Sequence, residues 1–198
     1  MSMPAEKLVS GEARPAVDPV EALAARLRSQ YAARITGELV VPARQGQYAA
    51  LPEDLDSRLV TALAGRGVER LYTHQATAWE SVQAGRHTVV VTPTASGKTL
   101  CYNLPVLQGV CDGQGKALYL FPTKALAQDQ VAELLALNEA GGLGVRAFTF
   151  DGDTPGDARK AVRTRCDIVV SNPDMLHQAI LPHHTKWAQF FEGLRYVV

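Results

Sequence analysis

From Leu71 to the end of the chain, short apolar runs alternate with helical stretches, and this alternation limits the possible folds more than any other feature of the sequence. Strands that alternate with helices form a parallel sheet with helices packed against it. The runs are rich in Val, Leu, Ile and aromatic residues, which is typical of strands buried on both faces. The predicted strands are Thr88–Thr92, Ala117–Phe121, Val145–Phe150, Asp167–Ser171 and Leu194–Val198.

The sequence before Leu71 predicts a helical extension. From Asp18 onward apolar residues recur at helical spacing, and Gly37 supplies a stop. A second amphipathic helix is expected after Pro52, ending at Gly65 or Gly67. We therefore expect a flexible arm over residues 1–17, a helical extension over 18–70 and one α/β domain over 71–198.

Composition narrows the class of protein. The chain has 20 Lys and Arg against 20 Asp and Glu, so any binding to nucleic acid must come from a local surface. An apolar content of 46% is enough for a sizeable core. The three cysteines lack the paired spacing of a disulfide framework or zinc site, and we expect reduced thiols. No apolar stretch suits a membrane span or a secretory signal, so we expect a cytoplasmic protein without a membrane partner.

The segment Thr92–Thr99, with the sequence TPTASGKT, directly follows a predicted strand and precedes a helical stretch. A bound nucleoside triphosphate needs converging backbone N–H donors, a cation and a hydroxyl group that helps to hold Mg²⁺. Lys98 supplies the cation and Thr99 the metal-binding hydroxyl, so these two are the predicted catalytic residues. A strict phosphate-loop pattern has glycine where this chain has Thr92, and the alternative is an ordinary turn with a solvated lysine. The predicted nucleotide-binding residues of this loop are Thr94, Ala95, Ser96, Gly97, Lys98 and Thr99.

A second nucleotide contact is predicted about two dozen positions upstream, at Tyr72 and Gln75. The glutamine amide carries both a donor and an acceptor, which suits the edge of adenine. The alternative is an ordinary exposed glutamine in the first turn of a helix.

Three further turns each join the end of a predicted strand to the start of a helix. In a parallel sheet such turns share one edge and can face a common ligand. Free N–H groups at a helix start can hold a backbone phosphate without reading base sequence. The predicted nucleic-acid-binding residues are Pro122, Thr123, Lys124, Gln128, Asp151, Gly152, Asn172 and Pro173.

Several other residues have a structural interpretation. We expect His183 and His184 to be loop residues rather than metal ligands, because neighbouring residues do not project together. Trp187, Phe190 and Phe191 have helical spacing and are expected to pack against the sheet. The basic run over residues 159–165 predicts a solvated helix face, with a phosphate-binding patch as the alternative.

Together these motifs resemble the first RecA-like domain of superfamily-two helicases of the DEAD/DEAH-box type, over about residues 51–198. Gln75 is similar to the Q motif, residues 121–130 to motif Ia and residues 171–177 to motif Ib. Three segments are most similar to the MrfA/YprA-type DNA-repair helicases: the phosphate loop, residues 151–154 (DGDT) and residues 172–177 (NPDMLH). By this resemblance Thr92 is typical of the family. The resemblance implies a RecA-like P-loop domain with a mainly parallel sheet and helices on both faces.

The resemblance also implies a function. It is that of an ATP-dependent helicase that uses ATP and Mg²⁺ to move along single-stranded nucleic acid, with DNA favoured over RNA. A second RecA-like domain of the same parent chain would supply arginine fingers. The sequence ends at Val198, before an Asp-Glu-x-His motif, so the 198 residues alone are expected to be inactive. The alternatives are a nucleotide-binding module or helicase remnant without catalysis, and a P-loop small-molecule kinase or transporter ATPase.

Overall fold

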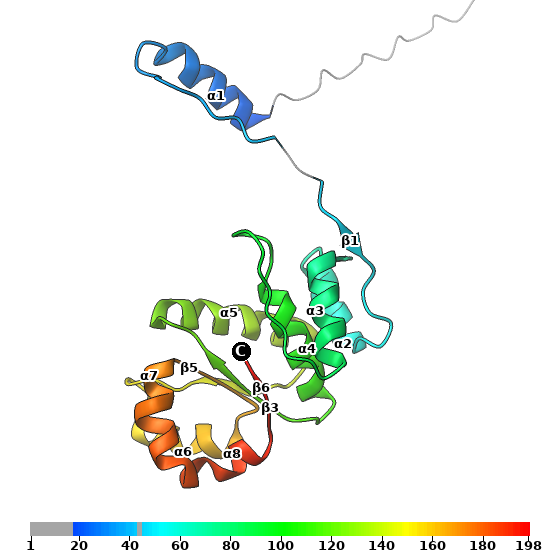
Figure 1. The fold of residues 1–198 in the computed structure, drawn as a ribbon, viewed down its shortest axis with the longest axis vertical. Coiled ribbons are helices and arrows are strands. Elements are labelled where there is room, and N and C mark those ends of the chain that lie inside the picture. Colours follow the sequence, from blue (N-terminus) through cyan, green and yellow to red (C-terminus); the bar gives the residue numbers. More distant parts are fainter. Residues whose placement is uncertain (1–17, 43–44) are drawn as a thin grey trace, which may run out of the picture. The chain divides into compact units, whose positions relative to one another are not determined.

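The computed structural model of the chain describes residues 18–42 and 45–198 (Figure 1). They belong to two compact units, one ending at Gln45 and the other beginning at Gly46. The flexible arm predicted over residues 1–17 lies outside the described residues. The helices are α1 (Pro19–Gln30), α2 (Ser57–Gly65), α3 (Thr73–Gln83), α4 (Thr99–Cys111), α5 (Lys124–Gly141), α6 (Gly156–Arg165), α7 (Pro173–Met175), the π-helix η1 (Leu176–Ile180), the 3₁₀-helix η2 (Leu181–Trp187) and α8 (Ala188–Glu192). The strands are β1 (Tyr48–Ala49), β2 (Leu71–Tyr72), β3 (Lys116–Leu120), β4 (Ala147–Thr149), β5 (Ile168–Ser171) and β6 (Leu194–Val197).

The first unit contains helix α1. Its start is as predicted, because the Asp18 carboxylate accepts a hydrogen bond from the Val20 N–H at 2.9 Å. The helix ends at Gln30, so the predicted continuation to a stop at Gly37 is wrong. The chain turns at Tyr31 and brings Glu38 back to the Arg28 guanidinium, whose Nε lies 2.8 Å from the carboxylate. No residue of α1 is buried.

The second unit is built on a parallel sheet with the strand order β4-β5-β3-β6. Strand β3 lies between β5 and β6, and Tyr119 of β3 faces Val170 of β5 in the register. Two short strands, β1 and β2, form a separate antiparallel pair that places Tyr48 opposite Tyr72. The predicted parallel sheet is therefore confirmed.

Helices cover both faces of this sheet (Figure 1). Tyr119 and Val170 belong to a core shared with α2, α3, α4 and α5. Leu118 and Val169, which alternate with them, belong to a second core shared with α6, η1, η2 and α8. This confirms the expected RecA-like arrangement. Helix α2 packs mainly against α5, so it contributes to the same core as the sheet.

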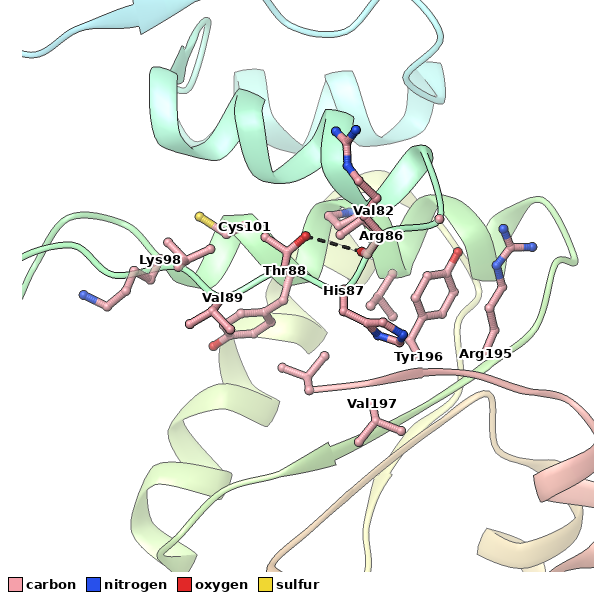
Figure 2. Close-up of a pocket in the computed structure, with 16 residues that line it drawn as sticks. Val82, Arg86, His87, Thr88, Val89, Lys98, Cys101, Arg195, Tyr196 and Val197 are labelled. Atoms are coloured by element: carbon pink, nitrogen blue, oxygen red, sulfur yellow. Dashed lines mark hydrogen bonds between the residues drawn. The ribbon is translucent and has the colours of Figure 1, made fainter.

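The strand predicted over Thr88–Thr92 is absent from the structure. The segment is extended but forms no ladder, and Val89 and Val91 are 88% and 89% exposed. A cavity of about 660 Å³ separates this segment from the open edge of β6, where Tyr196 and Val197 line the opposite wall (Figure 2). An apolar run becomes a strand only when a neighbouring strand accepts its hydrogen bonds. Within residues 45–198 no strand pairs with Thr88–Thr92, and the prediction of a strand there was wrong for that reason.

The remaining structural predictions concern the second core and the thiols. Trp187 and Phe190 are buried beneath the sheet, as expected. His183 and His184 are exposed but lie in the helix η2, not in a loop. Over residues 18–42 and 45–198, His, Cys, Asp and Glu side chains nowhere form a group of three that could bind a metal ion. The cysteines are free thiols, as predicted. Among the described helices, none has the length and apolarity needed to cross a membrane.

Candidate functional site

In the phosphate-loop segment the Lys98 side chain folds back over the backbone of the loop. The Lys98 Nζ donates to the carbonyl oxygens of Thr92 and Pro93 at 3.0 and 2.8 Å. Ala95 and Gly97 have φ values of 60° and 72°, in the left-handed region. A non-glycine residue there costs about 1–2 kcal/mol. Such strain at Ala95 is the kind of feature that accompanies a ligand-binding loop.

The curled loop leaves backbone donors free. Thr92 and Ser96 pair through their hydroxyl groups at 2.6 Å, which closes the loop from the inside. Within residues 45–198, the N–H groups of Thr94, Ala95, Gly97 and Lys98 donate no hydrogen bond. The loop then continues directly into α4, whose first residue is Thr99. Free N–H groups before a helix start, beside a lysine, are the donor set that a phosphate group requires.

Gln75 holds this loop from α3. Its Oε1 accepts from the Tyr72 N–H at 2.8 Å, and its Nε2 donates to the Gly97 carbonyl at 2.8 Å. The side chain is 4% exposed, so the alternative of an ordinary exposed glutamine is wrong. A Cβ atom at Gly97 would lie 2.8 Å from the Gln75 Nε2, which explains glycine at this position. Each amide atom keeps the capacity for one more hydrogen bond.

An aromatic stack lies beside the same loop. The Tyr72 ring stacks on Tyr48 at 4.9 Å between centroids and on His74 at 5.6 Å. The guanidinium of Arg70 lies 4.7 Å from the centre of the Tyr48 ring. The His74 Nε2 lies 2.9 Å from the carbonyl oxygen of Ser96, so the stack reaches the phosphate loop. The sequence argument included Tyr72 but missed the other three residues.

The three turns predicted to bind nucleic acid do meet at one edge of the sheet. The Phe121 N–H donates to the Ser171 carbonyl at 3.0 Å, and the Ser171 hydroxyl donates to the Phe150 carbonyl at 2.6 Å. These bonds join the ends of β3, β4 and β5. The first turn of α5 and the Asp151–Thr154 turn are joined by Lys124, which pairs with Asp153 and lies 4.0 Å from the Asp151 carboxylate.

Two of these turns have capped helix starts. The Thr123 hydroxyl accepts from the Leu126 N–H at 3.3 Å, and the Asn172 amide oxygen accepts from the Met175 N–H at 2.8 Å. Asn172 is thus the N-cap of α7. The other predicted contacts at this edge that are exposed are Pro122, Lys124, Gln128, Gly152 and Pro173.

One residue of the basic run differs from its prediction. The Arg159 guanidinium turns inward, and its Nε donates to the Thr154 carbonyl at 2.9 Å. It also lies 5.4 Å from the centre of the Phe150 ring. Arg159 therefore braces the Asp151–Thr154 turn, whereas Lys160 and Arg165 are exposed on α6 as expected.

This fold and loop define a RecA-like α/β domain with a phosphate-loop segment. Residues 72–198 match the family model described as DEAD/DEAH box helicase. The chain belongs to that family. It is 55% identical over 156 residues to the uncharacterized ATP-dependent helicase YprA of Bacillus subtilis, covering 78% of this chain and 21% of YprA. It is 42% identical over 176 residues to the ATP-dependent helicase hrq1 of Schizosaccharomyces pombe, covering 86% of this chain and 17% of hrq1.

Solved structures of the helicase MrfA have the same fold. The structure of MrfA bound to DNA matches with a TM-score of 0.76 and 54% identity, covering 79% of this chain and 21% of MrfA. The structure bound to DNA and AMPPNP matches with a TM-score of 0.79 and 50% identity, covering 87% of this chain and 25% of that protein. The chain thus corresponds to an MrfA/YprA-type first RecA-like domain. It spans only about a fifth of the length of the curated relatives it matches.

Proposed function

We propose that this chain is the ATP-binding and nucleic-acid-binding part of an ATP-dependent DNA helicase. The observation that carries the proposal is the loop over residues 92–99, which holds Lys98 beside free N–H donors. The relative MrfA has been solved with AMPPNP and DNA, which supports both ligands for this chain.

The residues around the loop fit a Mg²⁺-bound triphosphate. The free N–H groups of the loop would hold the phosphates, and Lys98 would leave the carbonyls of Thr92 and Pro93 to neutralise their charge. The Thr99 hydroxyl would be the ligand to Mg²⁺, which withdraws charge from the phosphate oxygens when bound. Gln75 would use its remaining hydrogen-bonding capacity for the adenine edge, beside the Tyr72 ring.

The edge formed by the ends of β3, β4 and β5 would bind the DNA backbone. Helix starts at Thr123 and Asn172 address phosphates rather than base edges, so binding would be independent of sequence and weakened by salt. Hydrolysis of ATP and movement along DNA would belong to the whole helicase. A second RecA-like domain would contribute the arginine fingers that stabilise the transition state.

The decisive test is the variant Lys98→Ala, titrated with Mg²⁺ and ATP by calorimetry. Losing a charge that contacts phosphate costs about 2–5 kcal/mol. At about 1.4 kcal/mol per factor of ten, affinity should fall at least thirtyfold. Lys186→Ala is the matched control, because Lys186 is an exposed lysine in η2. Equal affinity in the wild type and in a folded Lys98→Ala variant would exclude this phosphate site.

A further inference from the structure

Tyr102 lies on α4, one helical turn after Thr99, and contacts three other parts of the second unit. Its hydroxyl donates a hydrogen bond to the Gln130 side-chain oxygen on α5. Its ring meets Tyr119 edge to face, with centroids 5.7 Å apart and an angle of 88°. The same ring lies 6.5 Å from the ring of Phe121.

These contacts join the two halves of the candidate site. Helix α4 begins at the phosphate loop, and Tyr102 is on the same face of the helix as Thr99. Helix α5 begins at Lys124, in the turn predicted to hold a DNA phosphate. Phe121 precedes that turn directly, after the last residue of β3. One side chain therefore contacts both the helix and the strand end that position the turn.

A second tyrosine in the same cluster has a different connection. The Tyr119 hydroxyl donates to the Asn103 Oδ1 at 3.0 Å, which joins β3 to α4 but not to α5. The cluster is packed, with the Tyr119 and Phe121 rings 6.0 Å apart and edge to face. The Tyr102 phenol carries its proton at neutral pH as phenols ordinarily do, and burial raises its pKa further. Two phenols thus offer a matched comparison, since only one of them bridges the helices.

We propose that Tyr102 is a positioning residue that couples nucleotide binding at the phosphate loop to the nucleic-acid-binding turn at Thr123 and Lys124. The proposal rests on the function proposed above. A phosphate that draws Lys98 away from the Thr92 and Pro93 carbonyls rearranges the segment that leads into the first turn of α4. Tyr102 moves with that turn, and close packing passes the movement to α5.

The test uses backbone amide chemical shifts of the 198-residue chain, measured with and without saturating Mg²⁺ and AMPPNP. In the wild type, nucleotide should shift the N–H signals of residues 123–126. In Tyr102→Phe these shifts should fall at least threefold while the affinity for AMPPNP changes less than twofold. Gln130→Ala, which breaks the same bond from α5, should behave alike. Tyr119→Phe should keep the wild-type response, because it leaves that bond in place.

The outcomes separate this proposal from the one on which it rests. Failure of AMPPNP to bind the wild type would overturn both, and the titration shows this before any variant is made. Saturating binding without a response at residues 123–126 would overturn the coupling alone. So would an undiminished response in both Tyr102→Phe and Gln130→Ala. A merely structural role for Tyr102 predicts lower thermal stability with the nucleotide response intact, and that result also counts against coupling.

Discussion

Replacing Gln75 with alanine tests whether this residue holds the phosphate loop or only contacts the base. The substitution leaves the Tyr72 N–H and the Gly97 carbonyl without their partners, which lie 2.8 Å from the amide. Each lost bond costs about 1 kcal/mol, because both groups are near enough to solvent for water to replace part of it. The total of about 2 kcal/mol should lower the melting temperature by roughly 4–8 °C for a chain of this size.

The effect on nucleotides follows from the same bonds. The bond to Gly97 steadies the loop whichever base is bound, so Gln75→Ala should weaken the binding of both ATP and GTP, and that of ATP more because the contact with adenine is lost as well. We expect a loss of about 1.4 kcal/mol of binding free energy, which lowers the affinity about tenfold. Differential scanning calorimetry and isothermal titration with both nucleotides measure the two effects, with the exposed Gln83→Ala on the same helix as control. A variant with unchanged melting temperature and GTP affinity, but weaker ATP binding, would refute the loop-holding role and leave only recognition of adenine.

Two further substitutions test ion pairs. Asp153→Asn should raise the affinity for single-stranded DNA severalfold, since it frees Lys124 to meet a phosphate, and fluorescence anisotropy at several salt concentrations checks this; unchanged binding would count against Lys124 as a contact. Burial raises the pKa of Asp167, but hydrogen bonds from the Arg146 side chain and N–H outweigh it and hold the pKa below its ordinary value. Its stabilising contribution of about 1 kcal/mol is therefore complete above that ordinary value and is lost as the pH falls through the lowered one. Denaturant titrations of Asp167→Asn should show less loss of stability below pH 4 than the wild type, and an equal loss would contradict the assignment.

Strands that follow from local pattern were predicted well. The predicted strand Ala117–Phe121 differs by only one residue at each end from the observed β3, Lys116–Leu120. The prediction succeeded because apolar residues on both faces of a strand are a local signal of a buried strand. The run Val145–Phe150 overestimated β4, in which only Ala147–Thr149 pairs with β5. Thr88–Thr92 failed altogether although its pattern is equally strand-like. Whether a run joins a ladder depends on a neighbour distant in the sequence, which periodicity does not contain.

The same distinction separates the parts of the candidate site. The phosphate-loop motif is local, and the structure gives it a curled form in which the Lys98 side chain donates to the Thr92 and Pro93 carbonyls. The hydrogen bond from Gln75 to Gly97 is a tertiary contact, so the sequence suggested the residue but not its present partner. The motifs did not predict the Tyr48 ring, because its position beside Tyr72 depends on the register of β1 against β2. The prediction for Arg159 was wrong for a related reason, since the sequence of the basic run does not show that this side chain binds the Thr154 carbonyl.

The antiparallel pair of β1 and β2 extends the second unit upstream of the residues that match the family. The family match starts at residue 72, yet the Thr73 N–H donates to the Gln47 carbonyl at 3.0 Å and Tyr48 stacks on Tyr72. A shortened protein cut at the start of the match would lose that strand pairing and the Tyr48 ring of the aromatic stack beside the loop. It would also lose α2, whose Leu59 and Leu63 are fully buried in the core against α5. A shortened protein that keeps these contacts therefore begins near Gly46, upstream of β1, of α2 and of the start of the family match.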